Sequence, residues 1–127
     1  MGILLADDQP EVRRALTALL DRQPGMKVVG QAIDAADLLA QVETVNPGTV
    51  LLDWELPGGS QASLVSALRG VRPELVVIAL SGRPEARQDA LLAGVDAFVS
   101  KADPPEKLLE TIEFVGANGA SANRDPS

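Results

Sequence analysis

The sequence contains no cysteine and no histidine, and aromatic residues make up only 2% of it. Without cysteine there is no disulfide and no thiolate ligand, and without histidine there is neither an imidazole ligand nor the commonest general base. Zinc, haem and Ser-His-Asp chemistry are therefore excluded or nearly so. The core must be filled by Leu, Val, Ile and Ala, which suits helices packed on a sheet better than an aromatic-rich sandwich.

Basic residues are also scarce, because 11 Lys and Arg face 18 Asp and Glu, for a formal charge of −7. This balance argues against a basic surface for nucleic acid phosphates, so we expect no direct nucleic acid binding by this segment. No apolar run approaches the roughly 18 residues of a membrane span, and "MGILLADD" lacks the flanks of a signal peptide. We therefore expect no membrane segment and a cytoplasmic location.

What the chain does have is an alternation of two apolar patterns over a length that suits one domain. Short, nearly continuous apolar runs predict buried strands. They lie at residues 3–6, 27–32, 49–53, 75–80 and 97–100. Between them, apolar residues at helical spacing predict amphipathic helices. These lie near residues 12–20, 35–42, 64–68, 85–93 and 108–115.

The weakest predicted element is the helix at 85–93, which we expect to be the one most able to move because its packing is poor. Its apolar face consists mostly of Ala86, Ala90, Leu91 and Leu92. At the last helix, Asp103 with Glu106 three residues later resembles a capping box. We expect the domain to occupy residues 1–117, with 118–127 as a flexible tail or linker, because those residues are small, polar or turn-forming.

Polar residues stand at the carboxyl ends of the predicted strands. Five βα units in succession predict a doubly wound parallel sheet, in which ligands bind beyond those ends. The residues are Asp7, Asp8, Asp53, Ser81 and Lys101. If the first and third strands are neighbours, three carboxylates converge there, and such a cluster raises its own pKa values or recruits a cation. Oxygen ligands alone favour Mg²⁺ or Mn²⁺, and a carboxylate nucleophile beside a metal and a lysine suggests phosphoryl transfer onto an aspartate.

The segments "LLADDQ", "LLDWELPG", "ALSG" and "GVDAFVSK" resemble the receiver domain of two-component response regulators, over about residues 2–117. The segments "ILLADDQPEVRRAL" and "KADPPEKLLETI" are most similar to receivers that precede a LuxR-type helix-turn-helix output domain. The resemblance implies an α/β fold of the flavodoxin-like, CheY-like kind. In that fold a five-stranded parallel sheet of order 2-1-3-4-5 is flanked by five helices.

The resemblance also implies roles at matching positions. Asp53 would be the phosphoacceptor, and a sensor histidine kinase or a small phosphodonor would supply the phosphoryl group. Mg²⁺ would be the cofactor, held by Asp7, Asp8, Asp53 and the backbone carbonyl of Glu55. The function expected is thus a phosphorylation-controlled switch that is not an enzyme, except that it assists its own phosphorylation and dephosphorylation.

Further residues would transmit and time the signal. By resemblance, Ser81 and Lys101 would contact the phosphoryl group, and Ser81 with Phe98 would switch. The surface so changed would be that of the fourth helix, fifth strand and fifth helix, through which the domain would form a homodimer or bind a partner. The resemblance also implies a C-terminal DNA-binding domain that this segment does not include. Glu55 and Arg83 carry opposite charges just past phosphoryl-contacting residues, so an ion pair between them would set how long the phosphorylated state lasts.

Other interpretations remain open at this stage. The domain could be a receiver-fold interaction module that is not phosphorylated, or a haloacid dehalogenase-like phosphatase, although that motif requires an aspartate where Glu55 stands. Asp7 and Asp8 could simply cap a helix, as Asp often does. For Trp54 we expect a partly exposed packing residue, and for Arg13 and Arg14 a solvated helix face.

Overall fold

The computed structural model describes residues 1–116, in which five strands alternate with five helices. The strands are β1 (Gly2–Ala6), β2 (Lys27–Ala32), β3 (Thr49–Asp53), β4 (Val76–Ser81) and β5 (Ala97–Ser100). All neighbouring strands are parallel, in the order β2-β1-β3-β4-β5. The predicted fold class is therefore confirmed. The predicted domain end at 117 and the tail at 118–127 lie outside the described residues.

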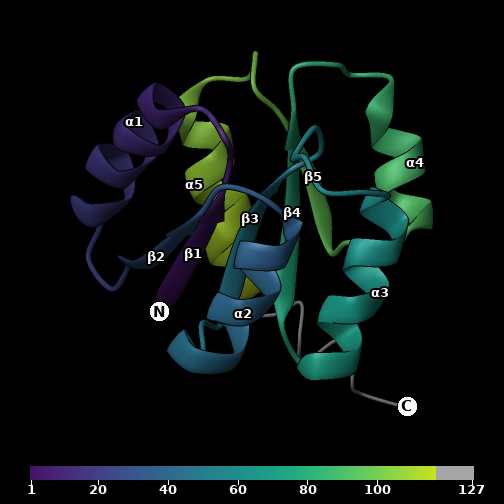
Figure 1. The fold of residues 1–127 in the computed structure, drawn as a ribbon. Helices are drawn as coiled ribbons and strands as arrows, with labels where there is room; N and C mark the ends of the chain where they lie inside the picture. The colour runs from purple at the N-terminus through teal and green to yellow at the C-terminus, as the bar shows by residue number, and fades with distance from the viewer. Residues whose placement is uncertain (117–127) are drawn as a thin grey trace, which may run out of the picture.

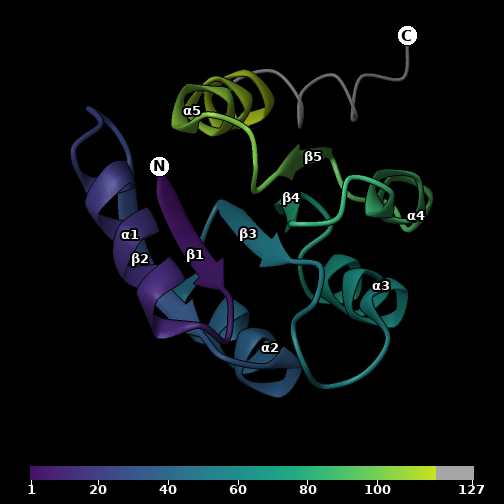
Figure 2. The same ribbon diagram turned by 90° about the horizontal axis from the view of Figure 1, so that it is seen from above.

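The helices form a layer on each face of the sheet. They are α1 (Pro10–Asp21), α2 (Ala35–Val45), α3 (Gln61–Val71), α4 (Ala86–Leu92) and α5 (Pro105–Phe114). Helices α1 and α5 cover one face, and α2, α3 and α4 cover the other (Figures 1 and 2). No helix within residues 1–116 is both long and apolar enough to cross a bilayer.

The sheet divides the core into two apolar clusters, because successive strand residues point to opposite faces. On β1, Ile3 and Leu5 pack in the cluster under α1 and α5, whereas Leu4 and Ala6 pack in the cluster under α2, α3 and α4. The central strands β3 and β4 are buried along their whole length. The edge strand β2 is only partly buried, so the expectation of strands covered on both faces holds for the centre of the sheet.

Helix α4 is shorter than the predicted 85–93, and fewer of its apolar side chains are buried than the sequence predicts. Only Ala86 and Ala90, one turn apart, face the core, whereas Leu91 is 41% and Leu92 79% exposed. Each residue turns a helix by 100°, so the two leucines cannot share the face of the alanines. The predicted apolar face is wrong for Leu91 and Leu92, and the only buried side chains of α4 are the methyl groups of two alanines.

The predicted capping box of α5 is also wrong. The helix begins with Pro104 as its N-cap, and no side chain caps it. The carboxylate of Asp103 instead accepts the backbone N–H of Ser100 at 3.2 Å. Asp103 therefore stabilises the turn after β5.

At the amino ends of the strands, Arg69 of α3 connects three segments. Its guanidinium donates to the carbonyl oxygens of Leu75 and Gly94 and to Oδ2 of Asp96, 2.9 Å away. The same Asp96 oxygen accepts the N–H of Val77 at 2.8 Å. Gly94 has φ 102°, a conformation that favours glycine. The end of α3, the start of β4 and the turn between α4 and β5 are thereby held together.

Candidate functional site

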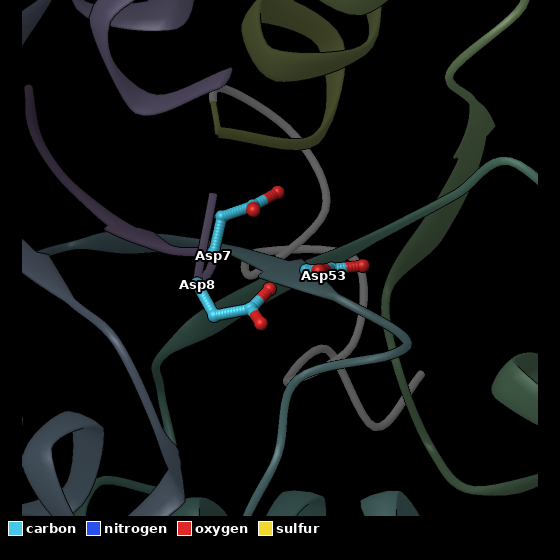
Figure 3. A group of neighbouring side chains, drawn as sticks. All are labelled: Asp7, Asp8 and Asp53. Atoms are coloured by element: carbon cyan, nitrogen blue, oxygen red, sulfur yellow. The ribbon is translucent and has the colours of Figure 1, made fainter. Parts of the chain in front are cut away.

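Three carboxylates gather at the carboxyl ends of β1 and β3 (Figure 3). Asp7 and Asp8 follow β1 directly, Asp53 is the last residue of β3, and these two strands are paired. One oxygen from each carboxylate lies within 4.8 Å of the others. Asp7 and Asp53 are buried, whereas Asp8 is exposed. The three residues therefore converge in the way that their positions at strand ends predict.

Lys101, directly after β5, joins two of these carboxylates. Its Nζ lies 3.1 Å from Oδ2 of Asp7 and 3.3 Å from Oδ1 of Asp53. Its backbone N–H donates to the carbonyl of Ser81 at 2.8 Å, which fixes the loop beside the end of β4. Burial by itself would lower the Lys101 pKa, but the charges of Asp53 and Asp7 outweigh it and leave that pKa raised. The ammonium group is therefore held in its charged form.

The balance at Asp53 is different, because burial dominates and raises the pKa of this carboxyl. The N–H of Glu55, which donates to Oδ1 at 3.1 Å, opposes the rise, as does Lys101, while the negative charge of Asp7 adds to it. When all four groups are ionised, three carboxylates face one ammonium. The excess of negative charge favours binding of a further cation.

The donor set fits Mg²⁺. Every available ligand atom is a hard oxygen, the type that Mg²⁺ prefers. Within residues 1–116, no group donates a hydrogen bond to the carboxylate of Asp8 or to the carbonyl oxygen of Glu55. The ion could therefore be held by Asp7, Asp8, Asp53 and the Glu55 carbonyl. At Asp8 and at the Glu55 carbonyl, its binding would break no existing hydrogen bond.

A second polar cluster lies beside the first and involves Ser81, Glu55 and Arg83. The Ser81 hydroxyl donates to the Glu55 carboxylate, 3.0 and 3.1 Å from its two oxygens, and accepts the N–H of Arg83 at 3.0 Å. The Arg83 guanidinium binds the same carboxylate, with Nη2 3.2 Å from Oε2. The structure thus forms the expected ion pair. It also places the Ser81 hydroxyl on Glu55, a contact that the sequence did not indicate.

Two aromatic residues flank the site. Phe98 on β5 is buried in the cluster under α2, α3 and α4. Trp54 packs in the same cluster and is only 8% exposed, so the expectation of partial exposure is wrong. Its backbone N–H donates to the carbonyl of Leu80 at 2.7 Å, which continues the pairing of β3 with β4 and draws the residue inward.

The capping interpretation of Asp7 and Asp8 is wrong, because the N-cap of α1 is Gln9. Asp7 does accept the N–H of Gln9, at 2.9 Å, but from outside the helix. The solvated interpretation holds for the exposed Arg14 but is wrong for Arg13. Its guanidinium donates from Nη1 to the carbonyl oxygen of Asp7 at 2.7 Å and from Nε to Oε1 of Gln31 at 3.0 Å.

Comparison with known proteins identifies a family that agrees with this arrangement of residues. Residues 3–113 match the family model described as response regulator receiver domain. The chain is 35% identical over 117 residues to the DNA-binding transcriptional activator DevR/DosR of Mycobacterium tuberculosis. It is 32% identical over 120 residues to the nitrate/nitrite response regulator protein NarP of Escherichia coli. These alignments cover 91% and 93% of this chain but 54% and 55% of the relatives, so the chain spans about half their length.

A solved structure agrees with these relatives. The crystal structure of a two-component response regulator of the LuxR family from Aurantimonas sp. matches with a TM-score of 0.85 at 28% identity, over 91% of this chain and 84% of that one. The family match spans nearly all of the described residues, and both relatives exceed 30% identity. The chain therefore belongs to the family of response regulator receiver domains.

Proposed function

We propose that Asp53 accepts a phosphoryl group from a sensor histidine kinase or a small phosphodonor, in a reaction that depends on Mg²⁺. The observation that carries the proposal is the position of Lys101, whose ammonium group bridges Asp7 and Asp53 beside the third carboxylate, Asp8. A buried nucleophile, a cation site and a fixed ammonium thus share one edge of the sheet. These are the components that phosphoryl transfer to a carboxylate requires.

The hydrogen bonds of Asp53 indicate which oxygen reacts. Oδ1 accepts the N–H of Glu55 and faces Lys101, whereas Oδ2 accepts no hydrogen bond from residues 1–116. Oδ2 therefore attacks the phosphorus atom; when the donor is a phosphohistidine of the kinase, the new O–P bond forms as the P–N bond breaks, with the electron pair left on the kinase's imidazole. Lys101 is placed to bind the transferred oxygens. Mg²⁺ held by Asp7, Asp8, Asp53 and the Glu55 carbonyl would neutralise part of their charge.

Phosphorylation would compete for the Ser81 hydroxyl. This fully buried group now donates to Glu55, and contact with the phosphoryl group requires it to leave that carboxylate. Movement of Ser81, followed by Phe98 in the adjacent core, would shift α4, which has little packing to resist. The surface of α4, β5 and α5 would then bind a second copy or a DNA-binding output domain. We further propose that the Glu55–Arg83 pair limits the access of hydrolytic water to the phosphorylated state.

Two rival functions have less support. A phosphatase of the haloacid dehalogenase kind would use the residue at position 55 as an acid, but the Glu55 carboxylate is occupied by Ser81 and Arg83. A receiver fold without phosphorylation would not need Lys101 between Asp7 and Asp53. We therefore propose a cytoplasmic signalling domain without enzymatic activity beyond its own phosphorylation and dephosphorylation.

Intact-mass measurement tests the central claim. After incubation with acetyl phosphate and Mg²⁺, the chain should gain the mass of one phosphoryl group, and Asp53→Asn should gain none. Asp37→Asn, which changes a carboxylate of α2 that binds the backbone of Ile33, is a matched control and should still be modified. Absence of the adduct in the unmodified chain would favour the non-phosphorylated module, and an adduct in Asp53→Asn would place the acceptor elsewhere.

A further inference from the structure

We propose that Arg13 is a positioning residue for the metal site, and that it acts by holding the peptide that leads into Asp8. The inference rests on the proposed function, since it concerns the Mg²⁺ ligands. Arg13 touches none of the three carboxylates in the described structure; its contacts are with a backbone carbonyl and with Gln31. Its effect on the site must therefore pass through the main chain.

The contacts of Arg13 join α1 to the ends of two strands. Its Nη1 donates to the Asp7 carbonyl at 2.7 Å, and the N–H of Asp7 donates to the carbonyl of Ala32 at 3.0 Å. The Asp7 backbone is thus held at both polar groups. On the other side, Arg13 Nε donates to the side-chain oxygen of Gln31, and the backbone carbonyl of this glutamine accepts Nε2 of Gln41 at 2.6 Å. Arg13 therefore bonds to one restrained carbonyl and to a side chain whose own main chain is held.

The residue most affected should be Asp8. The carbonyl of Asp7 and the nitrogen of Asp8 belong to one planar peptide group that ends at the Asp8 Cα, so fixing that carbonyl fixes the point from which the Asp8 side chain leaves the backbone. The Asp7 carboxylate has its own restraints in Gln9 and Lys101. The Asp8 carboxylate has no such donor within residues 1–116 and is exposed. Its position consequently depends on its backbone.

Charge and position predict opposite effects, which makes the inference testable. Arg13 is positively charged and lies near the proposed Mg²⁺ site, so by Coulomb repulsion alone its removal would strengthen Mg²⁺ binding. If Arg13 orients Asp8, its removal weakens Mg²⁺ binding instead. Arg13→Lys separates the two effects, because it keeps the charge while a single ammonium cannot reproduce the planar, two-point contact of a guanidinium.

The experiment is a calorimetric titration of the unphosphorylated chain with Mg²⁺. Arg13→Lys and Arg13→Ala should each weaken binding by about tenfold, the lower end of the range for residues that orient metal ligands. Gln31→Ala, which removes one anchor of Arg13, should weaken it by less. Arg14→Ala is the matched control, because this neighbouring exposed arginine has no hydrogen bond or ion pair within the described residues, and it should stay within about twofold.

Each outcome decides between the claims. If the unchanged chain binds no Mg²⁺, the proposed function fails at its metal site. If the unchanged chain binds Mg²⁺ and both Arg13→Lys and Gln31→Ala bind it equally well, the positioning role is wrong while the proposed function stands. Tighter binding by Arg13→Ala with unaltered binding by Arg13→Lys would show that Arg13 acts by charge alone. Because affinity is measured on folded protein, a mere loss of stability would not change it, and Gln31→Ala remains informative if an Arg13 variant does not fold.

Discussion

Replacing Glu55 by alanine should destabilise the unphosphorylated domain more than replacing its ion-pair partner. Glu55→Ala removes both the ion pair and the acceptor of the Ser81 hydroxyl. Arg83→Ala removes the ion pair alone, because Arg83 binds the Ser81 oxygen through its backbone N–H, which alanine retains. The two changes therefore separate a buried hydrogen bond from an exposed charge interaction.

The sizes of the two effects follow from exposure. The Ser81 side chain is fully buried, and a buried hydroxyl without its acceptor costs about 1–3 kcal/mol. The side chains of Arg83 and Glu55 are 56% and 41% exposed, so their ion pair contributes about 0–1 kcal/mol. We expect Glu55→Ala to lower the free energy of unfolding by about 1–3 kcal/mol and Arg83→Ala by less than about 1 kcal/mol. Glu55→Gln, whose amide oxygen can still accept from Ser81, should resemble Arg83→Ala.

Urea unfolding in EDTA measures these differences, and the lifetime of the phosphorylated state measures the second role of the pair. If the pair obstructs water, each single change and the double change should shorten the lifetime to a similar extent. A tenfold change corresponds to about 1.4 kcal/mol of barrier. Equal destabilisation by Glu55→Ala and Arg83→Ala would refute the hydrogen-bond argument. Lifetimes within about twofold of the unchanged chain, or additive effects, would refute the obstruction.

Three further predictions concern the acidic cluster and the switch. Because burial raises the pKa of the Asp53 carboxyl above its ordinary value of 3.8, the protonated carboxyl stabilises the fold without Mg²⁺ below pH 3.8, and this contribution is lost as the pH rises through the raised pKa. In EDTA, the free energy of unfolding of Asp53→Asn should therefore not show this loss with rising pH. Identical pH profiles for the unchanged chain and the variant would contradict the prediction. Mg²⁺ should quench the fluorescence of Trp54, next to Asp53, and Asp8→Ala should abolish the response; a full response in that variant would move the metal elsewhere. Beryllofluoride, which mimics the phosphoryl group, should change amide exchange over residues 85–98, and unchanged exchange would exclude a switch there.

The sheet and the acidic cluster could be predicted from sequence for the same reason. Short apolar runs indicate strands, and the run at 49–53 coincides with β3, which is buried along its whole length. The runs at 27–32 and 97–100 coincide with the two edge strands, which are partly buried. Residues that follow such strands must lie at one edge of a parallel sheet. Asp7, Asp53 and Lys101 therefore meet there without any need to know their side-chain conformations.

The side-chain contacts between separate elements could not be predicted in this way. Ser81 at the end of β4 reaches Glu55 in the loop after β3, and Arg13 on α1 reaches Gln31 on β2, over sequence separations of 26 and 18 residues. Helical spacing alone shows Arg13 on a polar face, and it gives no sign that the edge strand passes beneath it. The burial of Trp54 follows from the strand pairing that continues past the end of β3, which places its side chain on the same face as Leu52, two residues earlier.

The hydrogen bonds of Arg69 restrain the carboxyl end of α4. Arg69 holds the carbonyl of Gly94 just beyond the carboxyl end of α4, whereas the other end joins the loop that carries the exposed Arg83 contact. A displacement of α4 would therefore be smallest beside Gly94 and larger toward Ala86, where one alanine side chain holds the helix to the core, along a helix about 10 Å long. Leu91 and Leu92 lie at this restrained end of the helix. A partner resting on these leucines would therefore sense a change in the tilt of α4, with little change in the position of the contact itself.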